Sequence, residues 1–194
     1  MTARASFCSI VLGLDPGTRH FGWGLVKKEG TRLVHVAHGV IEPDVKRPLG
    51  ERLVVIEREL VAVVAAHRPE RASIESIFFA KDAQAASKLG HARGVAMLVC
   101  ARAELPTFEY PPARVKRTVA GGGRADKHQV AMMVRALLGL VELPPVDAAD
   151  ALALAVTLLQ QGPLAELQDA KMHPLSKLLQ RARTPIHRRR GPLV

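Results

Sequence analysis

The apolar and polar positions along the chain predict strands in its first part. Three apolar or alternating runs, at residues 7–14, 21–28 and 32–42, have the length and composition of strands. Pro16 and Gly17 place a tight turn between the first two runs. The connections are too short for crossovers between parallel strands, so these three strands are expected to be antiparallel neighbours.

The rest of the chain alternates between helical and strand patterns. Helical periodicity covers four stretches, namely residues 48–67, 83–103, 126–140 and 146–161. Residues 71–75 and 107–110 predict two further strands, and the basic, glycine-containing segment 111–127 is interpreted as a connection. This order predicts an α/β domain with a mixed five-stranded sheet flanked by helices.

The composition is typical of a folded protein. The chain has 194 residues, of which 48% are apolar, and this is enough to form a hydrophobic core. No uncharged apolar run reaches about 18 residues, so the sequence predicts no membrane span. Two cysteines do not make a disulfide framework, and we expect the protein in the reducing cytoplasm.

The net charge of +10 is concentrated at the C-terminus. From Lys171 onward there are seven lysines or arginines and no acidic residue, which divides the chain into a domain at 1–162 and a basic tail at 163–194. Such a tail can lie on phosphates or simply keep the protein soluble, and the pattern does not choose between these roles. The overall charge favours a polyanionic partner.

Four acidic residues stand where surface exposure does not explain them. Asp15 ends the first strand run, Glu75 ends the fourth, and Asp147 and Asp150 lie three apart at the start of an apolar helix. Three of them have ordinary explanations, since aspartates are common before Pro-Gly turns and in the first turn of a helix. Glu75 has no such explanation, because glutamate is a poor strand residue.

Together, these four carboxylates predict a metal site. If they converge from three buried elements they repel one another, and two divalent cations would offset their charge. Carboxylate oxygens suit Mg²⁺, with Mn²⁺ as a substitute, better than zinc. A pair of such ions can activate water and stabilise the leaving oxygen of a phosphodiester. An acidic centre in a basic protein therefore predicts metal-dependent cleavage of a nucleic acid.

Four motifs, in this order, carry a resemblance to a known family. They read "LGLDPGTRHFGWG", "IESIFFAKDAQAASKLGHARGVA", "FEYPPARVKRTVAGGGRADKHQV" and "VDAADALALA". Over roughly residues 9–161 the sequence resembles the RuvC Holliday junction resolvases, which have an RNase H-like fold. The resemblance implies that the metal-binding catalytic acids are Asp15, Glu75, Asp147 and Asp150.

The resemblance also implies a reaction and its partners. Family membership implies a homodimer that binds a four-way (Holliday) DNA junction in homologous recombination and DNA repair. Each subunit is expected to nick one of two strands of like polarity with Mg²⁺, leaving a 5′-phosphate and a 3′-hydroxyl. Cooperation with the branch-migration proteins RuvA and RuvB is implied as well.

Six residues are candidate DNA contacts, and they are Phe78, Lys81, Arg93, Arg114, Lys116 and Lys127. Phe78 is in a loop after Glu75, where an aromatic ring can insert between unstacked bases, with core packing as the alternative. Lys116 and Lys127 match basic residues that contact DNA in the family, and a lysine there can neutralise a phosphate. A solvated surface position is the alternative for each basic residue.

The alanine-rich helix at 83–103 is a candidate for the dimer interface. It carries Gly90, Gly94 and other small residues, which allow close approach of a second helix. Packing against its own sheet is the alternative, and the sequence alone leaves both open.

Three other functions compete with junction resolution. An actin-like nucleotide-binding protein has a similar strand-Asp-x-Gly-Thr turn, but it needs a second, similar half that this chain lacks. An RNase H-like nuclease for ribosomal RNA precursors would be shorter and would lack the "FFAK" loop. A junction-binding protein without catalysis would not need all four acids.

Overall fold

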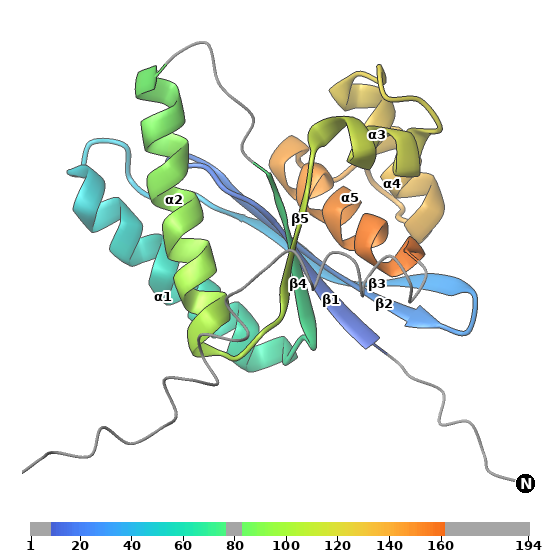
Figure 1. The fold of residues 1–194 in the computed structure, drawn as a ribbon, viewed down its shortest axis with the longest axis horizontal. Coiled ribbons are helices and arrows are strands. Elements are labelled where there is room, and N and C mark those ends of the chain that lie inside the picture. Colours follow the sequence, from blue (N-terminus) through green and yellow to red (C-terminus); the bar gives the residue numbers. More distant parts are fainter. Residues whose placement is uncertain (1–8, 77–82, 162–194) are drawn as a thin grey trace, which may run out of the picture. The chain divides into compact units, whose positions relative to one another are not determined.

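The computed structural model describes residues 9–76 and 83–161 (Figure 1). Its strands are β1 (Ser9–Asp15), β2 (Phe21–Glu29), β3 (Arg32–Ile41), β4 (Arg71–Glu75) and β5 (Thr107–Tyr110). Its helices are α1 (Leu49–His67), α2 (Ala83–Arg102), α3 (Pro112–Ala120), α4 (Lys127–Leu138) and α5 (Val146–Gln160). Within these residues no helix combines the length and the apolar character needed to cross a membrane. Phe78, Lys81 and the basic tail at 163–194 lie outside the described residues.

The sheet has the strand order β3-β2-β1-β4-β5. β1 pairs with β2 and β2 with β3 in antiparallel fashion, which confirms the prediction for the first three strands. β4 is parallel to both β1 and β5, so the predicted mixed, five-stranded sheet is confirmed. The parallel part places the carboxyl ends of three strands at one edge.

Helices cover both faces of the sheet. Figure 1 shows α1 and α2 on one side and α3, α4 and α5 on the other. The side chains of β1 alternate between the two cores, because Val11 packs in the same cluster as Leu152 of α5, and Leu12 packs with Ile56 of α1. Each core is therefore built from one face of the sheet and its own set of helices.

α5 lies unusually close to the sheet. Except for Asp150, all its residues from Ala148 to Leu159 are buried, as the apolar pattern predicts. A Cβ atom on Gly13 of β1 would lie 1.8 Å from the carbonyl oxygen of Ala151, far inside van der Waals contact. Since glycine has no side chain, the helix backbone rests directly on the strand.

The segment 111–127 is not the irregular connection that the sequence predicts. It contains the helix α3, which begins after Pro111 and ends at Gly121, whose φ of 73° is left-handed. Only Val115 and Val119 of this helix are buried, so the apolar pattern is too short to reveal it. The prolines and glycines of this segment mark the two ends of the helix.

Candidate active site

β1 and β4 bring two of the predicted acids to one edge of the sheet. These parallel neighbours have a register that pairs Leu14 with Ile74. The following residue of each strand is also its last, and these are Asp15 and Glu75. Because paired parallel strands run side by side in the same direction, the two carboxylates lie near each other at this edge.

α5 brings the other two acids to the same place. Asp147 is in its first turn, and Asp150 follows one turn later. Gly22 is the β2 partner of Asp15, and a Cβ atom on Gly22 would lie 2.0 Å from the carbonyl oxygen of Asp147. The absent side chain therefore lets the start of α5 lie on the strand position next to Asp15.

The acids influence one another electrostatically. The pKa of Asp15 is raised from 3.8 to about 7, first by burial and then by the charges of Asp150, Glu75 and Asp147, against an opposing effect of Lys127. Burial and the charge of Asp150 also raise the pKa of Glu75. A cluster with this property gains from a bound proton or a bound cation at neutral pH.

Lys127 supplies one positive charge to the cluster. Its Nζ donates a hydrogen bond to Oδ2 of Asp150 at 2.9 Å, and this contact raises the pKa of the lysine. Lys127 is the first residue of α4, where Asp126 and Gln129 form a capping box that fixes the start of the helix. The lysine side chain is 67% exposed, so it pairs with the acid while remaining accessible to a ligand.

The chemistry of the donors fits a hard divalent cation. All four acids offer carboxylate oxygens, and the raised pKa of Asp15 shows that the cluster gains from added positive charge. Among residues 9–76 and 83–161, no three His, Cys, Asp or Glu side chains converge as a ready-made metal cage. Proteins usually hold Mg²⁺ by one or two carboxylates, with water and substrate phosphates as the other ligands, so such an ion does not require a closed protein cage.

Two of the candidate DNA contacts lie beside the acids on α3. Lys116 is half-buried. Its positive charge lowers the pKa of Glu75, whereas burial raises it. The guanidinium of Arg114 lies 5.3 Å from the ring centroid of Tyr110, in a cation–π arrangement at the end of β5. These residues give the acidic cluster a basic rim.

Arg93 does not have the position of a DNA contact. It is 7% exposed, its Nη1 donates a hydrogen bond to the backbone carbonyl of Glu75, and its Nη2 forms an ion pair with Glu109. A buried guanidinium with two protein partners is poorly placed for a phosphate, so the structure does not support this contact, which stays a prediction. From the sequence we considered a DNA contact and a solvated surface position for Arg93, but not a buried ion pair.

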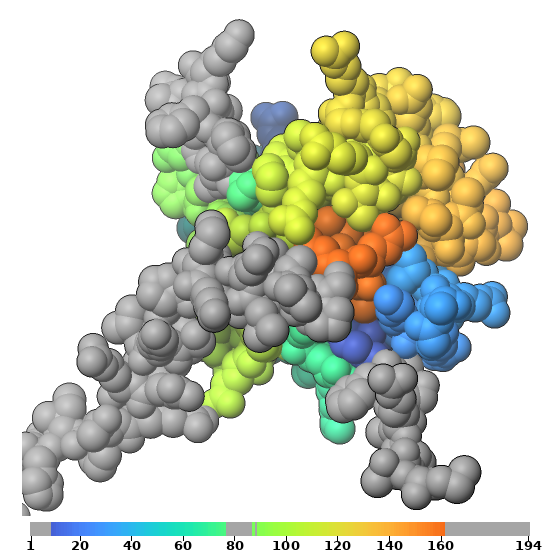
Figure 2. Space-filling model, turned by 45° about the vertical axis from the view of Figure 1, so that its right-hand side comes forward, coloured from blue at the N-terminus to red at the C-terminus, as the bar shows by residue number. Residues whose placement is uncertain are grey.

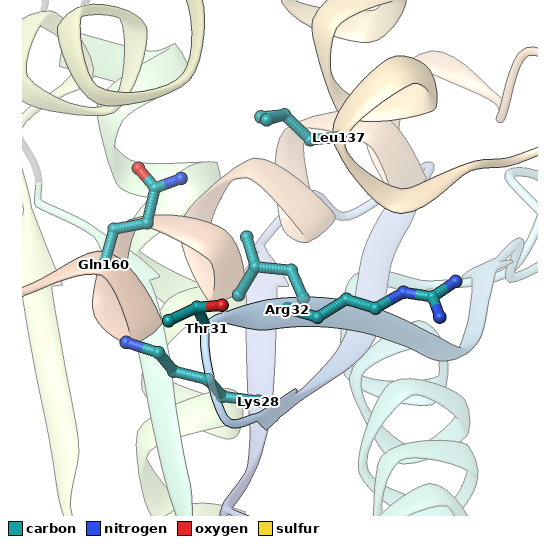
Figure 3. A pocket seen from close by; sticks show the side chains of 6 residues that line it. Lys28, Thr31, Arg32, Leu137 and Gln160 are labelled. Atoms are coloured by element: carbon teal, nitrogen blue, oxygen red, sulfur yellow. The ribbon is translucent and has the colours of Figure 1, made fainter.

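A surface pocket lies at the opposite end of α5 from the acids. Figure 3 shows its lining, which is Lys28, Thr31, Arg32, Leu33, Leu137 and Gln160. Lys28 Nζ donates to the carbonyl of Leu159 at 3.2 Å and so caps the C-terminal end of the helix. In Figure 2 the end of α5, in orange, reaches the surface between α3 and the β2–β3 hairpin. The pocket is separate from the acidic cluster, since Asp147 and Gln160 lie at opposite ends of the helix.

Comparison with known proteins identifies the family. Residues 11–158 match the family described as crossover junction endodeoxyribonuclease RuvC. The chain belongs to the RuvC family. It is therefore an endonuclease of the hydrolase class, and the resemblance seen in the four sequence motifs is confirmed.

Individual RuvC relatives agree with this assignment. A crossover junction endodeoxyribonuclease RuvC from Sorangium cellulosum is 54% identical over 167 residues, which cover 86% of this chain and 93% of the relative. The structure of RuvC from Thermus thermophilus in complex with a Holliday junction substrate is 37% identical, with a TM-score of 0.72, and the match covers 77% of this chain and 92% of that one. The yeast mitochondrial resolvase Ydc2, at 14% identity and a TM-score of 0.57, shares the fold.

Proposed function

We propose that this chain resolves four-way DNA junctions by paired symmetric nicks, with Mg²⁺ as cofactor, and leaves 5′-phosphate and 3′-hydroxyl ends. The observation that carries the proposal is the placement of Asp15 and Glu75 at the ends of two neighbouring parallel strands, with the start of α5 beside them. The RuvC family match and a relative solved with a Holliday junction substrate support the choice of DNA structure.

The four acids have a shared role in this proposal. Asp15, Glu75, Asp147 and Asp150 would hold the ions through their carboxylate oxygens. When bound, such ions activate water and stabilise charge on the leaving oxygen. The part of the protein is to hold ionised carboxylates at fixed positions on two strand ends and one helix, so that no rearrangement is needed during the reaction.

The lysines around the acids would bind the scissile phosphate. Lys127 is paired with Asp150, but it is 67% exposed and is therefore accessible to a phosphate oxygen. Lys116 is half-buried, and its positive charge lowers the pKa of Glu75 against the effect of burial. An ammonium group at either position offsets the charge that develops on the phosphate.

A second subunit is proposed to dock on the outer surface of α1 and α2. These helices pack side by side on the sheet (Figure 1) and expose Val54, Val61 and Leu98, with exposed fractions of 61%, 47% and 46%. A two-fold axis through this surface would give two identical sites, as paired nicks require. We further propose that the dimer acts in the cytoplasm in recombination and repair, together with RuvA and RuvB.

Cleavage of a labelled synthetic four-way DNA junction in Mg²⁺ tests the proposal. A linear duplex of the same sequence and an Asp15→Asn variant serve as controls. We expect paired nicks at symmetric positions of the junction only, and none with the variant, because the metal site would lose a carboxylate ligand. Equal cleavage of the duplex, or nicks that persist with the Asp15→Asn variant, would refute it.

The ends and the metal are tested in the same assay. Ligation of the nicked strands without prior treatment would establish 5′-phosphate and 3′-hydroxyl ends. Replacing Mg²⁺ by Mn²⁺ should retain cleavage, and EDTA should abolish it while leaving junction binding intact, since the basic rim does not depend on the metal.

A further inference from the structure

The buried ion pair between Arg93 and Glu109 is joined to the backbone of a candidate catalytic acid. Arg93 comes from α2 and is 7% exposed, and Glu109 comes from β5. Nη2 of Arg93 contacts Oε2 of Glu109. Nη1 donates a hydrogen bond to the carbonyl oxygen of Glu75 at 2.5 Å. One guanidinium thus connects α2, β5 and the end of β4.

The end of β4 is the point at which its pairing with β1 stops. The last pair between these strands is Leu14 with Ile74, one residue before Glu75. On the other side, Glu75 still pairs with Tyr110, and the amide of Ser76 donates to the carbonyl of Tyr110 at 2.9 Å. The hydrogen bond from Arg93 therefore holds the peptide of Glu75 where the ladder to β1 has ended.

The use of arginine at this buried position needs a reason. Burying a charge is costly unless it is paired, and an apolar side chain would fill the same space without that cost. The planar guanidinium of Arg93 can donate to a carboxylate and to a carbonyl in fixed directions at the same time, which an apolar side chain cannot do. Its partner Glu109 has a side chain that is 23% exposed, so the pair is shielded from solvent.

We infer that Arg93 is a positioning residue, which, with Glu109 as its counter-ion, fixes the backbone of Glu75 so that this carboxylate is held in place for a divalent cation. The inference deepens the proposed function, because it concerns the same metal site. Residues that orient a metal ligand from behind typically change metal affinity when they are replaced, even though they do not touch the ion.

The test is Mn²⁺ binding to the full-length protein without DNA, followed by electron paramagnetic resonance. Arg93→Met removes both contacts and keeps a long side chain. We expect its affinity for Mn²⁺ to fall by about 10–100-fold. Arg93→Lys keeps the charge and a donor, and it should recover part of this loss.

Two further variants make the experiment specific. Arg102 lies on the same helix and forms a surface ion pair with Glu57 at 2.6 Å, so Arg102→Met is a matched control that should leave Mn²⁺ affinity unchanged. Glu109→Gln keeps the size of the side chain and an acceptor oxygen but removes the charge. It should reduce Mn²⁺ affinity less than Arg93→Met, and it keeps the test available if that variant does not fold.

Two outcomes would overturn the inference. One is an unchanged Mn²⁺ affinity in folded Arg93→Met or Glu109→Gln protein. The other is weaker junction binding by Arg93→Met in EDTA, with a lower salt dependence, which would make Arg93 a phosphate contact. If the wild-type protein binds Mn²⁺ but does not nick junctions, the proposed function fails, whereas the effect of Arg93 on metal binding still decides the inference.

Discussion

The two faces of the sheet use their helices in different ways. On one face α5 is buried along almost its whole length and rests on glycines of β1 and β2. On the other face α1 and α2 leave apolar side chains at the surface, such as Val61 at 47% and Leu98 at 46% exposure. The first face fixes the positions of the acids, and the second is the face that we propose for a second subunit. If that proposal holds, catalytic geometry and assembly can be disrupted separately.

The largest expected effect is on the cleavage rate, and it comes from removing the charge of one of the clustered acids. Glu75→Gln or Asp150→Asn should reduce the rate of junction cleavage by about 1,000-fold or more, because several kcal/mol of charge stabilisation by bound metal is lost. Junction affinity should stay close to that of the wild type, because the basic rim is retained. Single-turnover cleavage and gel-shift titration of the same preparations measure both, and a parallel loss of binding would contradict the assignment.

A change that lifts α5 from the sheet should come next. A Cβ atom on Gly13 would meet the backbone of Ala151 at 1.8 Å, so Gly13→Ala forces the helix and the strand apart. We expect a loss of about 1–3 kcal/mol in the free energy of unfolding, typical of overpacking, together with reduced cleavage. Gly50 on α1 has open space around its Cβ position, and Gly50→Ala is the matched control that should retain both stability and cleavage. Urea unfolding and the junction assay check this, and a fully active Gly13→Ala protein would show that the close contact is unimportant.

A change at the other face should affect assembly alone. Val61→Glu combined with Leu98→Glu places two charges on the exposed surface of α1 and α2, which should turn a dimer into a monomer in light-scattering measurements. The melting temperature of the monomer should change little, because both side chains are already half-exposed. Val141→Glu, at a position that is 94% exposed and outside these helices, is the control. A double variant that still dimerises would place the interface elsewhere.

The smallest expected effect is that of Asp15→Asn on the stability of the metal-free protein. The pKa of Asp15 is raised from 3.8 to about 7, so the folded protein binds a proton that the unfolded chain releases between these values. The wild type therefore loses stability as pH rises through this range, and Asp15→Asn should lose less, because only the contribution of Asp15 is removed and that of Glu75 remains. By calorimetry in EDTA, the variant should melt a few degrees higher than the wild type at a pH of about 8 and should match it at a pH of about 4. If the melting temperatures of the two proteins change in parallel with pH, the charge of Asp15 does not destabilise the folded protein.

The strands, most helices and the site acids could be predicted because each leaves a local signal. Glu75 is the clearest case, since an acid at the end of a strand run has no structural explanation in the sequence. For Asp15, Asp147 and Asp150 the signal was their joint occurrence, and the electrostatic coupling in the structure agrees with it. The almost uncharged, mainly apolar pattern after Asp150 likewise predicted the burial of α5.

The features that sequence reasoning missed depend on contacts between distant segments. The pairing of Lys127 with Asp150 joins two helices that are adjacent only in the folded protein. Arg93 was predicted to contact DNA, although it precedes the buried Ala96 and Cys100 by three and seven residues and so lies on the buried side of α2. That spacing was the available signal. The helix α3 was missed because its two buried valines are too few to establish a period.

The glycine contacts beneath α5 also affect how the protein tolerates change. Where backbone meets backbone, at Gly13 with Ala151 and at Gly22 with Asp147, the distance between strand and helix does not depend on the shape of any side chain. Drift in the apolar sequence of the core can therefore raise or lower stability while the spacing of the acids stays constant. Substitutions of apolar core residues should therefore leave the positions of the acids unchanged, whereas substitutions of Gly13 or Gly22 should move them.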